Sequence, residues 1–314
     1  MKRYLLFAYL FIILVLMIPW TQWNQSLSDL KNDLRVMAIL PLENNPFWKG
    51  VWNGIRESAQ EASFLLSEYE FSDTQEAIQL LDIATKTDID GLLLAPKVSL
   101  DQTFYEKLGQ LRDKGVKVAI LDTDIEAEYY DAFVGIDNSE AGTVLGEYLV
   151  SKLQPEQKIL EIHGISPLSN NMQERIDAFH SVMEREGIRS QIETLEAASG
   201  YLQGTQNILK ILQQSDDFMY LVAVGPGYTL YAASAVVMAE MSDKLDVIGF
   251  GETEEALQYV EHGVIEALFV QANTQLGKKG VQIMEQLLLG EKTEKRYDID
   301  INLVTAENVQ NYME

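Results

Sequence analysis

The sequence predicts an α/β fold made of two doubly wound, Rossmann-like lobes behind an N-terminal membrane-anchor helix. Short apolar runs bounded by charge alternate with segments of helical period, and this alternation restarts after residue 138. Such runs are typical of buried strands in a parallel sheet with helices on both faces. A third observation, an unbroken apolar run near the start of the chain, predicts the anchor.

The first unit alternates strands and helices up to residue 138. Asp73 and Glu76 have the spacing of a capping box, which predicts a helix start, and Gly115 suits a helix end. The expected strands are residues 36–40, 64–71, 91–96, 118–121 and 133–136. The expected helices are residues 47–62, a segment starting near residue 73, and residues 101–114.

The second unit repeats the alternation towards the end of the chain. Its expected strands are residues 158–163, 190–195, 219–224, 245–250 and 264–270, followed by an extended segment at 298–303. Its expected helices are residues 139–153, 170–186, 201–214, 229–241, 254–262 and 274–289. Two such units in succession predict two lobes, and a cleft between lobes is a preferred position for a ligand.

Polar residues follow two neighbouring strands of the first unit. Asp122 and Asp124 come after the run at 118–121, and Asp137 and Asn138 come after the next run. The carboxyl ends of parallel strands form the edge at which open α/β sheets bind ligands. We therefore expect Asp122 to face a ligand cleft.

The composition excludes several classes of function. The net charge of −24 and the pI of about 4.4 argue against a nucleic-acid partner, because phosphate binding needs a basic surface. The sequence has no cysteine, which excludes disulfides, thiolate metal sites, a cysteine nucleophile and a lipidated amino-terminal cysteine. The acidity is typical of a solvated protein outside the cell.

The start of the chain predicts a membrane anchor. Lys2 and Arg3 precede the apolar run at 5–18, and Trp20 and Trp23 follow it. The uncharged stretch is long enough to cross a bilayer, with basic residues on the cytoplasmic side and tryptophans at the outer interface.

A cleaved signal peptide is the alternative, but the residues after the apolar run are bulky or polar and do not form a small-x-small cleavage site. We expect residues 1–23 to be an uncleaved anchor and residues 24–35 a short stalk. The domain formed by residues 36–314 would then lie on the extracytoplasmic face of the cell membrane.

The sequence lacks the motifs of the enzyme classes that use this fold. The segment Gly225-Pro226-Gly227 does not have the spacing of a dinucleotide-binding loop, and there is no G-x-S-x-G elbow. His163, His180 and His262 are scattered without metal-ligand spacing. His163 ends a strand, where it could line the cleft or belong to a solvated loop. We predict a binding protein rather than an enzyme, without metal or cofactor.

Six short motifs, in order along the chain, resemble those of a known family. They are Asn45-Pro46-Phe47-Trp48, Leu121-Asp122, Gly135-Ile136-Asp137-Asn138 with Ala141-Gly142, Arg175-Ile176-Asp177-Ala178-Phe179, Val247-Ile248-Gly249-Phe250, and Gln271 before Gly277. By these motifs the chain resembles type I periplasmic solute-binding proteins, most closely the ribose- and galactose-binding branch. Regulators similar to the lac repressor share this core, but here the expected anchor occupies the place of their DNA-binding helices.

The resemblance implies two lobes joined by a hinge of three crossings, near residues 137–138, 271 and 300. Ligand binding would close the lobes about this hinge. The lobes implied are residues 36–137 with 272–300, and residues 138–271 with 301–314.

The resemblance also implies which residues hold a ligand. Family members place a sugar between aromatic rings, while charged and amide groups bind its hydroxyls, because buried hydroxyls need partners. The matching positions are Asn45, Phe47, Trp48, Asp122, Arg175, Tyr201, Phe250 and Gln271.

Structural roles compete with several of these assignments. Asn45 could cap the helix that follows, and Phe47 could be its hydrophobic staple. Phe47 and Trp48 cannot point in the same direction on a helix, so we expect one of them in the core. Asp122 could be a capping or hinge acid, and Arg175 could form a surface ion pair.

The sequence also departs from the family pattern at positions that bind sugar hydroxyls. Thr123 replaces an arginine, and Gly225-Pro226 replaces an asparagine and an aspartate. Gly251 replaces an aspartate, with Glu252 one residue later, and Ala95 replaces an asparagine. These departures favour a less polar or substituted ligand over ribose, or else a pocket that serves only for contact with another protein.

We predict an extracytoplasmic binding protein for a sugar or sugar-like solute that serves an ABC importer. The alternative is a ligand-sensing subunit that signals to a membrane histidine kinase. The anchor and the absence of a lipid-site cysteine favour sensing, whereas the commonest use of the family favours transport.

Overall fold

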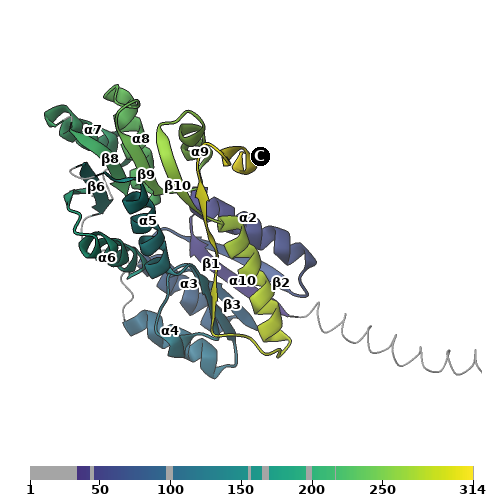
Figure 1. The fold of residues 1–314 in the computed structure, drawn as a ribbon. Helices are drawn as coiled ribbons and strands as arrows, with labels where there is room; N and C mark the ends of the chain where they lie inside the picture. Colours follow the sequence, from purple (N-terminus) through teal and green to yellow (C-terminus); the bar gives the residue numbers. More distant parts are fainter. Residues whose placement is uncertain are drawn as a thin grey trace, which may run out of the picture.

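The described chain forms two sheets of mostly parallel strands, each covered by helices on both faces (Figure 1). The structure is a computed structural model. It describes residues 34–42, 46–96, 102–154, 157–164, 170–195, 200–215 and 217–313.

The first sheet and its helices form the first lobe. Its strands, all parallel and in their order across the sheet, are β11 (Arg296–Asp298), β5 (Ala132–Gly135), β4 (Lys117–Leu121), β3 (Gly91–Leu94), β1 (Arg35–Pro41) and β2 (Leu65–Phe71). One face packs against α2 (Pro46–Glu61) and α10 (Asn273–Leu288), and the other against α3 (Thr74–Lys86) and α4 (Gln102–Asp113).

The second sheet has the same plan. Its strands in order are β12 (Ile301–Val304), β10 (Ile265–Gln271), β9 (Asp246–Phe250), β8 (Phe218–Ala223), β6 (Lys158–Gly164) and β7 (Ser190–Leu195), and β12 is antiparallel to β10. One face packs against α5 (Asn138–Lys152) and α6 (Asn170–Arg185), and the other against α7 (Gly200–Gln214), α8 (Pro226–Met238) and α9 (Glu254–Glu261).

Strand β1 shows why continuous apolar runs form these sheets. Val36, Ala38 and Leu40 belong to the core shared with α2 and α10. Met37 and Ile39 belong to the core on the opposite face. Successive side chains of a strand point to opposite faces, so a strand covered on both sides must be apolar at every position.

Close backbone contact fixes α10 beside α2 in the first lobe. A Cβ atom on Gly277 would lie 2.1 Å from the carbonyl oxygen of Val51, and one on Gly54 would lie 2.0 Å from that of Thr274. Neither position has room for a larger residue. The first turn of α10 is therefore held next to the first turns of α2, where the site described below is built.

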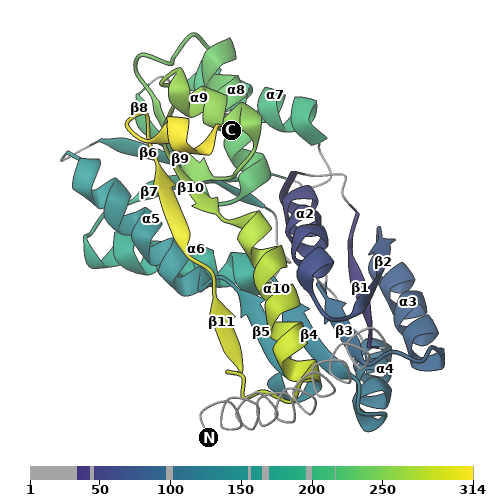
Figure 2. The ribbon, with the colours of Figure 1, turned by 90° about the vertical axis from the view of Figure 1, so that its right-hand side faces the viewer.

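The chain passes between the two sheets three times, after β5, after β10 and after β11. Figure 2 shows the last passage as the yellow segment that runs from β11 in the first sheet towards the second. The single extended segment expected at 298–303 is thus two strands, because each pairs with a different sheet. The expected lobe limits, 36–137 with 272–300 and 138–271 with 301–314, stay a prediction.

Two helix ends have the expected caps, and one helix, α8, has other bounds than expected. Asp73 accepts a hydrogen bond from the backbone N–H of Glu76 at 2.9 Å, and Gly115 has φ +85°. Helix α8 begins at Pro226 rather than at residue 229, since proline fits the first turn of a helix. It ends at Met238 rather than at residue 241, and Glu240 then adopts φ +56°.

The expected anchor lies outside the described residues, as does nearly all of the expected stalk. Arg35, the last residue of that stalk, is the first residue of β1. Within the described residues, every helix is too short or too polar to cross a membrane.

Candidate ligand-binding site

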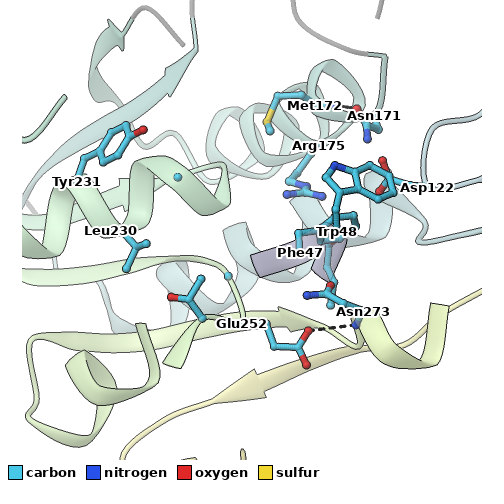
Figure 3. Close-up of a pocket in the computed structure, with 14 residues that line it drawn as sticks. Phe47, Trp48, Asp122, Asn171, Met172, Arg175, Leu230, Tyr231, Glu252 and Asn273 are labelled. Carbon is cyan, nitrogen blue, oxygen red and sulfur yellow. Dashed lines mark hydrogen bonds between the residues drawn. The ribbon is translucent and has the colours of Figure 1, made fainter. Parts of the chain in front are cut away.

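A cavity of about 450 Å³ lies between the two lobes (Figure 3). Its walls come from the first turns of α2, α6, α8 and α10 and from the ends of β4, β9 and β10. The lining residues are Phe47, Trp48, Asp122, Asn171, Met172, Arg175, Gly227, Leu230, Tyr231, Gly251, Glu252, Thr253, Gln271 and Asn273.

Asp122 lies at the carboxyl end of β4 and faces this cavity. Its φ of +66° is unusual for a residue other than glycine, although aspartate tolerates this region better than most. Its carboxylate accepts a hydrogen bond of 3.0 Å from the Thr123 hydroxyl. Burial raises the pKa of Asp122 to about 6, against the opposing effects of Thr123 and Arg175. The carboxylate is therefore short of the partners that it would have in water.

Arg175 approaches from the second lobe and is only 4% exposed. Its position depends on Gly142 of α5, where a Cβ atom would lie 2.0 Å from the Arg175 carbonyl oxygen. The guanidinium lies 4.1 Å from the centre of the Phe250 ring, and its Nη2 donates to Asn138 Oδ1 at 2.8 Å. Burial lowers the pKa of Arg175 to about 10, so the group stays charged at neutral pH.

Two nitrogens of Arg175, Nε and Nη1, are buried and have no hydrogen-bond partner in the described structure. Buried donors are almost always paired, and an unpaired donor costs about 1–3 kcal/mol. A second unpaired group, Asn273 Oδ1, is buried in the opposite wall. The cavity thus presents unmet donors from one lobe and an unmet acceptor from the other.

Phe47 and Trp48 both border the cavity from the first turn of α2. Their rings meet edge to face with centroids 4.9 Å apart. Trp48 also packs in the core of the first lobe, with 9% of its surface exposed, while Phe47 is half-buried. The expectation that one of the two belongs to the core fits Trp48, although this ring reaches the cavity as well.

The end of β10 contributes Gln271, and the first turn of α10 contributes Asn273. Glu252, from the loop after β9, accepts a hydrogen bond of 3.1 Å from the Asn273 backbone N–H. This bond joins the second lobe to a helix of the first. Burial raises the pKa of Glu252. Glu252 lines the cavity although it is not among the expected site residues, and like Asp122 it follows the end of a strand.

Two expected site residues lie behind the cavity wall. Phe250 is fully buried beneath the Arg175 guanidinium, and it is absent from the cavity lining. Tyr201 is 44% exposed and donates to Glu255 Oε1 at 2.8 Å, while its ring packs edge-on against Tyr231. A third, Asn45, lies outside the described residues.

The second lobe supplies lining residues that the sequence did not suggest. Met172 comes from the first turn of α6, and Leu230 and Tyr231 come from α8. Apolar residues at helical spacing indicate core packing, and both α8 residues do pack partly against the core. Only the position of the opposite lobe shows that they also face a cavity.

Two of the histidines expected to be scattered lie together, away from the cavity. His180 Nε2 is 2.7 Å and His163 Nε2 is 3.7 Å from Oε1 of Glu161, which is fully buried. His163 is a largely buried residue of β6 and does not line the cavity. The two expected positions, in the cleft or in a solvated loop, are therefore both wrong. Among the described residues, no group of three or more histidine, aspartate or glutamate side chains could hold a metal ion.

The fold and sequence match known solute-binding proteins. A ribose import binding protein of Escherichia coli K12 is 23% identical over 87% of this chain and 90% of its own length. The structure of an ABC transporter solute-binding protein from Agrobacterium vitis with bound D-fucose has a TM-score of 0.78 and 22% identity, over 88% of this chain and 96% of that one. The XylFII-LytSN complex contains a chain with a TM-score of 0.74 and 23% identity, over 88% and 98% of the two chains.

A family model described as a periplasmic binding protein domain matches residues 36–292. This range includes both sheets except β11 and β12, and it includes every described residue that lines the cavity. The resemblance seen in the short sequence motifs is confirmed. The chain belongs to the periplasmic binding protein domain family, as a type I solute-binding protein.

Proposed function

We propose that this protein binds a sugar or sugar-like solute between its lobes, outside the cell membrane, and delivers the solute to an ABC importer. The relatives described as ribose import binding proteins support this use, as does the fold shared with a D-fucose-bound solute-binding protein. The N-terminal segment would tether the protein to the membrane.

The observation that carries the proposal is the state of Arg175. A buried guanidinium with Nε and Nη1 unpaired is stabilised by an incoming hydroxyl or other acceptor. Asp122 on the opposite wall is a buried carboxylate that accepts from the Thr123 hydroxyl, and a polyol can donate to it and accept from Arg175 at once. Phe47 and Trp48 supply rings on which the CH face of a sugar packs.

These groups come from different lobes, and this links binding to closure. Asp122 and Asn273 belong to elements of the first lobe, and Arg175 belongs to the second. A ligand that bonds both walls stabilises the closed arrangement, because it binds that arrangement better than the open one. The three passages between the sheets are the segments that would bend.

The test is a thermal-shift screen of the full-length protein against monosaccharides, polyols and nucleosides, since a bound ligand raises the melting temperature. Asp122→Ala and Arg175→Ala should each abolish the shift that a binding compound produces. Arg185→Ala is the matched control, because Arg185 lies on the same helix with an exposed side chain paired to Glu186. Unchanged shifts in the first two variants would refute the site.

A second candidate function is ligand sensing through a membrane histidine kinase. The similarity to the XylFII chain, described in complex with LytSN, favours it, as does the lack of a cysteine for lipid attachment. Cross-linking in native membranes, followed by mass spectrometry, separates the two. Capture of a permease supports import, and capture of a sensor kinase without permease replaces import by sensing.

A further inference from the structure

The two ends of the cavity differ in chemistry. Figure 3 shows Asp122, Phe47 and Trp48 at one end and Leu230 and Tyr231 at the other. Arg175 lies between these ends in the same view, and the methyl group of Met172 reaches the start of α8, where a Cβ atom on Gly225 would lie 3.0 Å from Met172 Cε. The first end offers charge and aromatic faces, and the second is mostly apolar. We call the second the α8 end, defined by Met172, Gly227, Leu230 and Tyr231.

The ring of Tyr231 is held in a fixed place at the α8 end. Gly204 of α7 leaves room for it, because a Cβ atom there would lie 2.4 Å from Tyr231 Cδ2. Tyr201 and Tyr228 pack edge to face against it, with centroids 5.8 and 6.0 Å away. Tyr201 is itself anchored by hydrogen bonds to Ser234 and Glu255. An aromatic surface fixed in this way is preorganised for a ligand.

Apart from the Tyr231 hydroxyl, the residues that define the α8 end offer no side-chain oxygen or nitrogen to a sugar hydroxyl. Gly225 and Gly227, at the start of α8, provide no side-chain donor or acceptor, and Gly251 after β9 provides none either. Leu230 and Tyr231 are each only partly buried, so part of their apolar surface is left uncovered. Covering such surface is favourable at roughly 25 cal/mol per Å².

The cavity also extends beyond the end that holds Asp122, Phe47 and Trp48. Its volume of about 450 Å³ falls in the range of about 300–1,000 Å³ that is typical of pockets for drug-sized ligands. A ring held by Asp122 and Arg175 occupies the first end and leaves the α8 end open.

We propose that the ligand is a sugar that carries an apolar, planar substituent, as in an aryl glycoside or a nucleoside. The sugar lies between Phe47, Trp48, Asp122 and Arg175, and the substituent lies against Met172, Leu230 and Tyr231. This inference rests on the proposed function, since it assigns the substrate class of the same site.

The test compares matched glycosides by isothermal titration calorimetry on the full-length protein. Methyl and phenyl glycosides of several hexoses and pentoses are titrated beside the free sugars. The phenyl compound of the preferred sugar should bind at least roughly tenfold more tightly than the methyl compound, as expected for one buried apolar group.

Leu230→Asn should reduce the phenyl-to-methyl preference to about one, because it makes the α8 end polar. Leu289→Asn is the matched control, an exposed leucine at the end of α10, and it should keep the preference. Met172→Gln gives a second variant of the α8 end, should Leu230→Asn fold poorly.

The outcomes separate this inference from the proposed function. Binding of free sugars or methyl glycosides with no gain from the phenyl group would overturn the inference and leave the proposed function standing. A preference that persists in both Leu230→Asn and Met172→Gln would overturn it as well. If no sugar, glycoside or nucleoside binds, the proposed function fails and the inference fails with it.

Discussion

Helix α6 contributes to two buried charged centres that are satisfied to different degrees. Towards the cavity, Arg175 leaves two buried nitrogens unpaired. On the other side of the helix, His180 contacts Glu161, whose second oxygen accepts from the Ser190 hydroxyl at 2.9 Å. Both oxygens of Glu161 therefore have partners.

The difference separates a binding centre from a structural one. Removing one partner of a buried, fully paired carboxylate leaves a charge uncompensated and destabilises the fold. A buried guanidinium with unmet donors lowers the stability of the empty protein and gains partners from a ligand. Unpaired buried polar atoms also occur at Trp52, Arg112 and Thr205, but those of Arg175 and Asn273 belong to residues that line one cavity, and this supports the proposed site.

The largest effect is expected at the structural centre. His180→Ala leaves only the more distant His163, at 3.7 Å, beside Oε1 of the buried Glu161. It should lower the free energy of unfolding by about 3 kcal/mol, the lower end of the range for breaking a buried ion pair, because His180 is itself partly exposed. Urea denaturation measures this. His262→Ala, at an exposed position, is the control and should change stability by less than about 1 kcal/mol. If both variants changed the free energy of unfolding equally, the structural role assigned to the Glu161–His180 pair would be wrong.

The next effect concerns the glycine that places Arg175. Gly142→Ala puts a methyl group 2.0 Å from the Arg175 carbonyl oxygen, so α6 must shift. We expect a loss of about 1–3 kcal/mol of stability, as for other overpacked sites, together with weaker ligand binding. In contrast, Gly109→Ala in α4 meets no atom within 4 Å and should stabilise by about 0.5–1 kcal/mol. Denaturation and calorimetry of both variants check this pair.

A smaller change in stability is expected at the cavity itself. Arg175→Met removes two unpaired buried donors and keeps an apolar contact with Phe250, although Asn138 loses its partner. The free energy of unfolding should stay within about 1 kcal/mol of the original, while ligand binding is lost. Loss of several kcal/mol without ligand would show that Arg175 is structural, and the comparison would fail.

The last prediction uses pH to distinguish the two centres. The pKa of Asp122 is raised from 3.8 to about 6, so this group lowers stability as pH rises from about 4 through 6. The pKa of His180 is raised above 6.5 by its hydrogen bond to Glu161, so its contribution is full below 6.5 and is lost as pH rises above that value.

Stability measured by urea denaturation across this pH range distinguishes the two. Relative to the unmodified protein, Asp122→Asn should flatten the change between pH 4 and 6, and His180→Asn should flatten the change above 6.5. Ligand binding should also strengthen as Asp122 ionises near pH 6. A profile that is the same in all three proteins would contradict both assignments.

Much of the fold could be predicted from local patterns. The run at 36–40 forms β1, and the segment at 170–186 forms α6, within one or two residues. Asp122 was selected by its place after a strand, and it does line the cavity. A strand end is a local feature, and parallel topology brings such ends to one edge.

The roles of neighbouring aromatic residues could not be predicted in this way. Tyr201 lies on α7 and Tyr231 on the adjacent α8. The sequence around each predicts a helix and does not show which ring faces the cavity. Only the packing of α7 on α8, with Gly204 beneath the ring, places Tyr231 in the cavity wall and Tyr201 behind it. Phe250 likewise lies under Arg175 because α6 covers that face of the second sheet.

The sequence by itself determined the alternation of strands and helices, the family and the strand-end acid, because each depends on residues close together in the chain. The tertiary structure decided which buried charges are satisfied. Glu161 meets His180 and Ser190 from two other elements, whereas Nε and Nη1 of Arg175 and Oδ1 of Asn273 have no partner in the described structure. Hydrogen-bond satisfaction depends on atoms brought together from distant positions in the chain, and for this reason local sequence patterns could not predict it.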